Sequence, residues 1–290
     1  MHHTLRLAAA LVLLGAIAPL PRPAAAETYH ACAGFIDTLP ATITTQGTWC
    51  LRADLSTSMA SGAAITIATN NVTIDCNDFK LGGLAAGDAT QAIGISAQSR
   101  FNATVRHCNV RGFHYGTLLT GAGHAVLDSR FDNSTYVGVF IAGDGSVVRG
   151  NRISDTGGST VQYKSNAFGI YFDSTYAGTL LDNFVQGVYA TPGSNSAAYG
   201  ALIYFVRGEA ARNTIASLEG AGTGQVYGIS NNMAGGGHAV IRDNTIAVGT
   251  WDDLAGVGIS CSGSIARDNT TSGFTTALLS CADGGGNFAN

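Results

Sequence analysis

The sequence predicts an all-β chain that folds as a right-handed parallel β-helix, a solenoid of stacked coils. Two short motifs, one built on Asn and one on Gly, alternate along most of the chain. The 290 residues include 39 glycines, and only 12% of the residues are charged. The sequence has no long amphipathic helical pattern. Because a coil of two or three short strands cannot bury its own apolar residues, the coils must stack.

Residues 1–26 have the parts of a secretory signal peptide. Arg6 gives a basic start, an apolar run of 14 residues extends from Leu7 to Leu20, and three alanines at 24–26 suit cleavage. The run is shorter than the roughly 20 residues that cross a bilayer. We therefore expect residues 27–290 to form a single β-helix domain with an N-terminal cap, secreted or periplasmic and without a membrane span.

Charge and cysteine content restrict the possible partners. The chain has 19 acidic and 15 basic residues, a net charge of −4. Because nucleic-acid phosphates require a basic surface, nucleic acid is excluded as the expected partner. The six cysteines are even in number and lack zinc spacing, which predicts disulfides and no metal site. We expect no cofactor, since no Ca²⁺-binding loop motif is present, and we expect a monomer.

The first motif reads apolar, two variable residues, Asn, one variable residue, apolar. Its copies are centred on Asn77, Asn151, Asn183, Asn213, Asn244 and, more weakly, Asn269, with Cys108 and Ser129 in the same slot of two further copies. An inward amide at a tight bend can bond to the same amide one coil above and below, so that its polar atoms are not buried unpaired. These residues are predicted to form a structural ladder.

The second motif is a Gly followed by a short apolar strand. It occurs at Gly94, Gly116, Gly138, Gly169, Gly200, Gly228 and Gly258. The residue before Gly is aromatic at Tyr115, Phe168, Tyr199 and Tyr227. Because this position has the same parity as the inward apolar residue after Gly, the pattern predicts an internal aromatic stack.

Four consecutive coils are longer than their neighbours, and the extra residues always enter between the Asn slot and the next Gly. The long segments are 152–168, 184–199, 214–227 and 245–257. Insertions stacked at one corner form a wall beside the neighbouring strand face, and loops on a rigid scaffold often carry function. We expect the functional site at this corner.

The strand face beside the predicted wall has aromatic and charged residues at outward positions on adjacent coils. They are Phe140, Tyr171, Asp173, Tyr204 and Arg207, with Tyr163 and Lys164 in the first long segment. Rings and a few charges in a groove suit a sugar chain, whose C–H faces pack on rings while its hydroxyls bind polar groups. The alternative is an ordinary exposed β-face. His114 and Tyr115 are a further candidate acid–base pair.

A row of arginines and aspartates precedes the Asn slot. It comprises Arg106, Arg149, Arg242 and Arg267 with Asp128, Asp182, Asp243 and Asp268, and Arg212 lies nearby. The first interpretation is a surface ion-pair network. The alternative is a carboxylate-binding edge, because Arg binds carboxylates through two parallel hydrogen bonds.

Two segments resemble the opening coils of bacterial right-handed parallel β-helix repeat proteins of the pectate-lyase-like superfamily. They are residues 64–83, which contain Asp75-Cys76-Asn77, and residues 102–113, which contain His107-Cys108. The resemblance covers residues 32–281 and implies the fold. It does not imply one activity, because the superfamily includes lyases, epimerases, hydrolases and proteins without known catalysis, and none of its catalytic motifs can be carried over.

The resemblance also implies three disulfides. The expected pairs are Cys32–Cys50 at the N-terminal cap, Cys76–Cys108 and Cys261–Cys281. In the last two pairs the cysteines occupy similar positions on neighbouring coils, which stack about 4.8 Å apart, and this spacing suits disulfide geometry.

Taken together, these features predict a carbohydrate-active protein that binds a uronic-acid-containing extracellular polysaccharide. If it is an enzyme, we expect a polysaccharide lyase that acts by β-elimination, in which an Arg or Lys neutralises the carboxylate and a Tyr exchanges the proton. The catalytic candidates are Tyr171, Asp173, Tyr204 and Arg207, and the substrate-binding candidates are Phe140, Arg149, Tyr163 and Lys164. The alternative is a non-catalytic glycan-binding or surface scaffold. A glycoside hydrolase needs two carboxylates, and Asp173 alone occupies the outward face.

Overall fold

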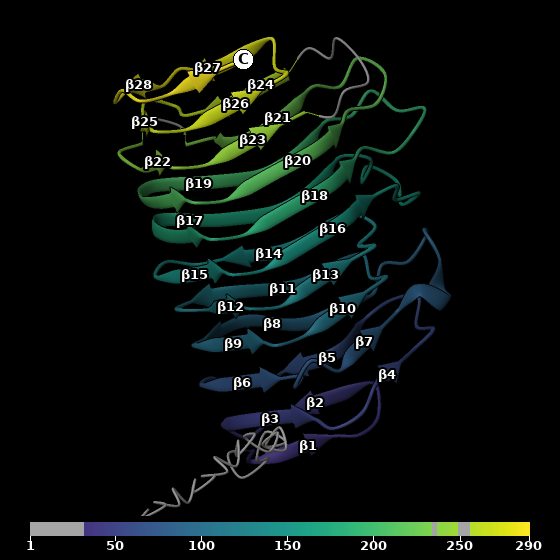
Figure 1. The fold of residues 1–290 in the computed structure, drawn as a ribbon. Coiled ribbons are helices and arrows are strands. Elements are labelled where there is room, and N and C mark those ends of the chain that lie inside the picture. The colour runs from purple at the N-terminus through teal and green to yellow at the C-terminus, as the bar shows by residue number, and fades with distance from the viewer. Residues whose placement is uncertain (1–31, 234–236, 249–255) are drawn as a thin grey trace, which may run out of the picture.

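The computed structural model describes residues 32–233, 237–248 and 256–290, so the predicted signal peptide lies outside the described residues. Figure 1 shows coils stacked along one axis, from the N-terminal strands at one end to the C-terminal strands at the other. Strands of successive coils pair in parallel. The predicted all-β parallel β-helix is confirmed.

Each coil contributes strands to three faces. The first face consists of β2 (Ala41–Ile43), β5 (Ala63–Ile67), β8 (Ile93–Phe101), β11 (Tyr115–Ala122), β14 (Val137–Ala142), the first parts of β17 (Ala167–Leu181) and β19 (Ala198–Ala211), β21 (Val226–Asn231), β24 (Gly256–Ser260) and β27 (Thr276–Leu279). The second face consists of β1 (Gly34–Ile36), β3 (Gly47–Leu51), β6 (Val72–Asp75), β9 (Ala103–Arg106), β12 (Ala125–Leu127), β15 (Ser146–Arg149), the last parts of β17 and β19, β22 (Val240–Arg242), β25 (Ile265–Arg267) and β28 (Ala282–Asp283).

The third face is a separate ten-stranded sheet. It consists of β4 (Leu55–Ser56), β7 (Lys80–Gly82), β10 (Asn109–Arg111), β13 (Arg130–Asp132), β16 (Arg152–Gly157), β18 (Phe184–Tyr189), β20 (Thr214–Glu219), β23 (Thr245–Ala247), β26 (Thr270–Ser272) and β29 (Phe288–Ala289). The first and second faces belong to one sheet, because β17 and β19 turn the corner between them and pair with strands of both. A short 3-10 helix, Leu84–Ala86, follows β7.

The core is built from columns of apolar side chains that repeat once per coil. On the third face the column runs through Val110, Phe131, Ile153, Val185, Ile215 and Ile246, which are in register and at most 1% exposed. Burial of each side chain contributes roughly 2 kcal/mol. Because each coil supplies one member of every column, the core is continuous along the axis.

The predicted Asn ladder runs from Asn151 to Asn287. The backbone N–H and Nδ2 of each Asn donate to Oδ1 of the Asn on the next coil, over distances of 2.9–3.1 Å. Each Nδ2 also donates to a backbone carbonyl of the preceding coil. The predicted ladder is confirmed for Asn151, Asn183, Asn213, Asn244 and Asn269, whereas Asn77 lies outside it and its Nδ2 donates to the carbonyl of Leu51. The last member of the ladder, Asn287, follows three glycines and does not fit the motif, because Gly284 stands where the motif has an apolar residue.

All three implied disulfides are present: Cys32–Cys50, Cys76–Cys108 and Cys261–Cys281. The second one replaces the amide ladder near the N-terminus, because Cys108 occupies the Asn slot of its coil. The backbone N–H of Cys108 donates to Ser129 Oγ, and the N–H of Ser129 donates to Asn151 Oδ1. Three disulfides are typical of secreted or periplasmic proteins.

Most of the arginine row on the second face forms ion pairs, as its first interpretation predicts, whereas Arg149 and Asp128 form none among the described residues. The pairs are Arg106–Asp75, Arg212–Asp182, Arg242–Glu209, Arg242–Asp243 and Arg267–Asp268. The pairs whose side chains are both exposed, such as Arg212–Asp182 and Arg267–Asp268, contribute at most about 1 kcal/mol each. The described residues contain no helix with the length and apolar character of a membrane span.

Candidate functional site

The repeated Gly breaks the side-chain alternation of the first face. A Cβ at Gly138 would lie 2.7 Å from Cγ2 of the core residue Ile153, so Gly138 faces inward. The next residue, Val139, is also fully buried, while the strand register pairs Val137 with Phe168 and skips the Gly. Two consecutive inward positions turn the residue before Gly outward. The prediction of an internal aromatic stack is therefore wrong in its location, because the rings lie outside the main core.

The rings before Gly join the outward side chains of the first face in one cluster, which we call the aromatic face. Its members are the buried Val137, Phe168 and Leu202 and the half-buried Tyr115, Tyr136, Phe140, Tyr171, Tyr199 and Tyr204. The ring of Tyr199 stacks between Phe168 and Tyr227, with centroid distances of 5.0 and 4.8 Å. The cluster is separate from the main apolar core.

Tyr171 lies at the centre of the aromatic face. Its ring stacks on Phe140 at 4.9 Å and lies 5.8 Å from the ring of Tyr204. Burial, the neighbouring phenol of Tyr204 and the negative charge of Asp173 raise the pKa of Tyr171 above its ordinary value. Burial and the neighbouring carboxylate of Asp144 raise the pKa of Asp173. The phenol of Tyr171 is therefore protonated near neutral pH.

Tyr136 connects the aromatic face to a lysine and a buried histidine. Its ring stacks on His114 at 5.0 Å, and Nζ of Lys164 lies 4.8 Å from its centroid. His114 is 3% exposed, and its Nδ1 lies 3.1 Å from Oγ1 of Thr135. Burial, followed by the charge of Lys164, lowers the pKa of His114 to about 4. Among the described residues Lys164 forms no ion pair.

The predicted wall is present for the first three insertions. The strands β16, β18 and β20 have six residues each, whereas β10 and β13 have three, and the segments that follow them stack on one another. Thr191 N donates to Ser165 O at 2.8 Å, and Ala221 N donates to Ser196 O at 3.0 Å. The hydroxyls of Ser196 and Ser165 lie 2.8 Å apart. In the fourth insertion, 245–257, residues 249–255 lie outside the described part.

The remaining candidate residues are not brought to the centre of the aromatic face. The guanidinium of Arg207 is exposed and lies 5.5 Å from the ring centroid of Tyr176, and within the described chain it forms no ion pair with Asp173. Arg149 lies at the end of β15 on the second face, where its charge acts on Asp182. Tyr163 is 89% exposed next to Lys164. The structure thus brings Phe140, Tyr171, Asp173 and Tyr204 together, and Lys164 adjoins them through Tyr136.

Sequence reasoning missed Tyr136 and Asp144. A signal for Tyr136 was present, because His114 and Tyr136 both stand two residues before the repeated Gly, on adjacent coils. Asp144 gave no such signal. It lies in the turn after β14, where it accepts hydrogen bonds from Ser174 Oγ at 3.0 Å and from the backbone N–H of Tyr176 at 2.7 Å.

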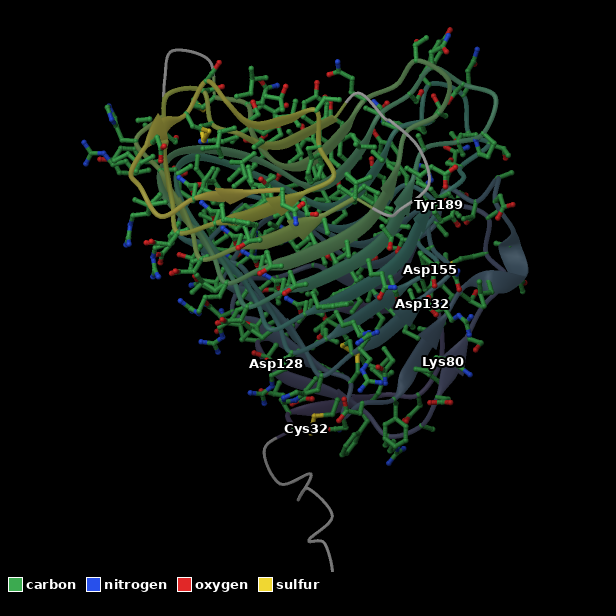
Figure 2. All side chains as sticks on the ribbon, turned by 45° about the horizontal axis from the view of Figure 1, so that its top comes forward. Cys32, Lys80, Asp128, Asp132, Asp155 and Tyr189 are labelled. Carbon is green, nitrogen blue, oxygen red and sulfur yellow. A yellow bond between two sulfur atoms is a disulfide. The ribbon has the colours of Figure 1, made fainter. Side chains whose placement is uncertain are left out.

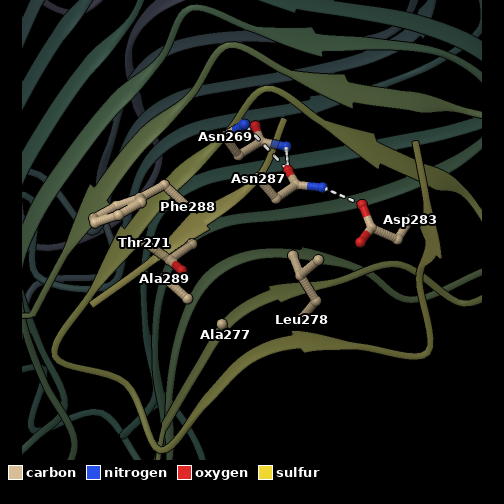
Figure 3. Close-up of a pocket in the computed structure, with 8 residues that line it drawn as sticks. All are labelled: Asn269, Thr271, Ala277, Leu278, Asp283, Asn287, Phe288 and Ala289. Carbon is tan, nitrogen blue, oxygen red and sulfur yellow. Dashed lines mark hydrogen bonds between the residues drawn. The ribbon is translucent and has the colours of Figure 1, made fainter. Parts of the chain in front are cut away.

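A cavity of about 260 Å³ lies at the C-terminal end of the coil stack (Figure 3). It is lined by Asn269, Thr271, Ala277, Leu278, Asp283, Asn287, Phe288 and Ala289. Its polar side chains bond to one another, since Asn287 accepts from Asn269 and donates to Asp283. Within the described ranges, no group of three or more His, Cys, Asp or Glu side chains is placed to hold a metal ion.

No protein-family model matches this chain, and no curated protein matches it in sequence. Among solved structures, the Dettilon tailspike protein is similar in fold, with a TM-score of 0.53 and 17% identity over 87% of this chain. This chain spans 58% of the length of that tailspike. The coil stack and this similarity define the chain as a right-handed parallel β-helix repeat protein.

Two further solved structures were matched at lower TM-scores. One is a mutant tailspike protein of E. coli bacteriophage HK620 in complex with a pentasaccharide, with a TM-score of 0.47 and 12% identity over 84% of this chain and 60% of that one. The other is the A-module of a mannuronan C-5 epimerase of Azotobacter vinelandii, with a TM-score of 0.35 and 11% identity over 89% of this chain and 91% of that one.

Proposed function

We propose that this chain binds a uronic-acid-containing polysaccharide along the aromatic face, beside the wall of stacked loops. The observation that carries the proposal is the continuous cluster of half-buried rings outside the main core. Clustered apolar surface of this kind marks binding sites in soluble proteins. Tyrosines suit a sugar in particular, because each offers an apolar ring and a hydroxyl that forms hydrogen bonds.

The surroundings of the rings supply the polar contacts that a sugar chain requires. Asn232 Nδ2 lies 3.5 Å from the hydroxyl of Tyr204, and the same outward columns continue as Ser230 and Ser260 on the next coils. Lys164 adds an ammonium group that lacks a carboxylate partner among the described residues. Such a cation at the edge of an aromatic surface supports recognition of a uronic acid carboxylate.

The geometry supports binding better than β-elimination. Elimination requires a base that is deprotonated at the working pH, and burial raises the pKa of Tyr171 instead of lowering it. It also requires a cation beside the reacting carbon, whereas Arg207 lies against Tyr176 and Lys164 adjoins the rings at Tyr136 and not at Tyr171. We therefore favour non-catalytic glycan binding over polysaccharide lyase activity.

The proposal is tested by isothermal titration of polygalacturonate, alginate and neutral dextran. We expect the two uronans to bind more tightly than dextran. Lys164→Gln should weaken uronan binding about tenfold, the size of one charge-assisted hydrogen bond, and leave dextran unchanged. Lys80→Gln is the matched control, because Lys80 is an exposed lysine that pairs with Asp54 on the third face. If Lys164→Gln bound each uronan as tightly as wild type does, the proposal would be contradicted.

The catalytic alternative has a separate readout. Elimination produces an unsaturated uronate that absorbs ultraviolet light, so purified protein mixed with each uronan can be followed by absorbance. We expect no product. Product that forms with wild type and disappears in Tyr171→Phe would restore the lyase interpretation.

We also propose that residues 1–26 are removed during export and that the mature chain is secreted or periplasmic. The three disulfides support this proposal, because such bonds persist in oxidising compartments. Mass spectrometry of the exported protein tests it, and the expected N-terminal residue is Glu27.

A further inference from the structure

A second polar cavity lies where the 3-10 helix meets the third face, and it shares no lining residue with the aromatic face, which adjoins it at Tyr136. It has a volume of about 180 Å³ and is lined by Leu84, Gly87, Asp88, Gly112, Asn133, Thr135, Gly157 and Tyr189. The backbone N–H of Thr160, in the first wall loop, donates to the carbonyl of Asp88 at 3.2 Å and ties the two segments together. At about 30 Å³ per water molecule, the cavity has room for roughly six waters, which is the space of one sugar ring.

The lining combines an aromatic ring, an apolar edge and polar groups. The ring of Tyr189 lies against the segment of Gly158, and Leu84 is 50% exposed. Thr135 is 6% exposed, and its hydroxyl is bonded to His114. Asn133 Oδ1 accepts from Arg111 at 3.0 Å, and its Nδ2 makes no hydrogen bond among the described residues. A ring with hydroxyl and amide groups around it is the usual composition of a small polar-ligand site.

Three carboxylates surround Tyr189. Figure 2 shows Asp132, Asp155 and Tyr189 following one another along one corner of the coil stack, and Asp88 lines the cavity itself. Burial and the negative charges of these three aspartates raise the pKa of Tyr189. Asp132 is neutralised by Arg111 at 2.9 Å. In the described part of the chain, Asp88 and Asp155 form no ion pair, so no direct partner neutralises these two carboxylates.

We infer that this cavity binds a single amino-sugar unit. The ring of the sugar packs between Tyr189 and Leu84, its hydroxyls reach Asn133, and its ammonium group lies beside Asp88. The two carboxylates exclude acidic sugars, in contrast to the aromatic face, where Lys164 favours them. The two sites therefore select sugars of opposite charge.

The inference is tested by titrating the full chain with four small probes: glucosamine, glucose, glucuronate and ethanolamine. We expect glucosamine to bind about tenfold more tightly than glucose, since it adds one charge-assisted hydrogen bond. Glucuronate should not bind. Ethanolamine should bind more weakly than glucosamine, because it lacks the ring. Ethanolamine as tight as glucosamine would overturn the inference, since the aspartates would then attract any small cation.

Two variants locate the binding. Leu84→Trp fills the cavity from an exposed position and should abolish glucosamine binding, and Asp88→Asn should reduce it about tenfold. Asp128→Asn is the matched control, because Asp128 is an exposed aspartate at a different corner of the coil stack (Figure 2). Unchanged glucosamine binding in folded Leu84→Trp would overturn the inference. Lys164→Gln should leave glucosamine binding intact, so the outcome here does not depend on uronan binding at the aromatic face.

Discussion

The Asn ladder and the aromatic face repeat with the same period, once per coil, but they lie on opposite sides of the backbone. The amides from Asn151 to Asn269 are 1–2% exposed, and their polar atoms bond to the coils above and below. The rings of Tyr171, Tyr199 and Tyr204 are half-buried and lie outside the main core. A repeated residue therefore contributes stability when all of its hydrogen-bonding groups are paired within the fold. It can bind a ligand when some of these groups have no partner in the protein.

The largest effect should come from breaking the amide ladder at its middle. Asn213→Ala removes the acceptor of two Asn183 donors and the donor to Leu180 and Asn244, and so leaves several buried groups unpaired. We expect the free energy of unfolding to fall by about 4 kcal/mol in urea titrations. Asn232→Ala, at an exposed asparagine, is the control and should change it by less than about 0.5 kcal/mol. A similar loss of unfolding free energy in Asn213→Ala and Asn232→Ala would show that the ladder asparagines are no more important for stability than an exposed one.

The next effect concerns the coil in which Cys108 occupies the position of the ladder Asn and forms a disulfide with Cys76. Cys76→Ser combined with Cys108→Ser opens a bridge between residues separated by 32 positions. Chain entropy predicts a loss of about 3 to 4 kcal/mol, measured by urea titration without reductant. The bridge Cys32–Cys50 spans 18 positions, so its double Ser variant should lose less. The opposite order would show that local packing outweighs loop length.

A pH effect should come from His114, the buried histidine beside the aromatic face, because the amide ladder does not titrate. His114 has its pKa lowered to about 4, so between that value and its ordinary value near 6.5 the unfolded chain binds a proton that the folded chain does not. Stability due to neutral His114 is complete above about pH 6.5 and falls as the pH decreases toward 4, by about 2 to 3 kcal/mol. His114→Gln should flatten that part of the pH profile relative to wild type. If the stability of wild type and His114→Gln changed with pH in the same way, His114 would not be the group responsible.

The smallest effect on stability should come from the aromatic face itself. Tyr204→Ala removes a half-buried ring with one neighbouring ring, and the expected loss is about 1 kcal/mol or less. Uronan affinity should nevertheless fall about fivefold to tenfold in isothermal titration. Phe205→Ala is the contrasting variant, since Phe205 is fully buried beside Phe172, and it should cost about 3 to 5 kcal/mol. A large stability loss in Tyr204→Ala would assign its ring to the core.

The sequence predicted the fold and the ladder because each depends on a motif that recurs once per coil, and the resemblance to β-helix repeat proteins implied the disulfide pairs. The sequence predicted the wall for a similar reason, since the length of each coil can be counted. The sequence pattern placed the rings before Gly in the core, because it assumed that inward and outward side chains alternate without a break. In the structure each Gly occupies an extra inward position, which turns the preceding ring outward. Arg207 follows Tyr204 closely in the chain, but the irregular register between Ser174 and Ala177 and the ring of Tyr176 place it elsewhere.

The amino-acid sequence by itself determined the parallel β-helix, because periodic burial and periodic bonding are properties of the repeat. Only the tertiary structure decided which repeated residues face solvent, and which residues from different coils meet. Lys164 beside Tyr136, and Asp88 beside Tyr189, come from segments 28 and 101 positions apart, respectively. No local pattern encodes such contacts, since they depend on how the loops fold back across the coils.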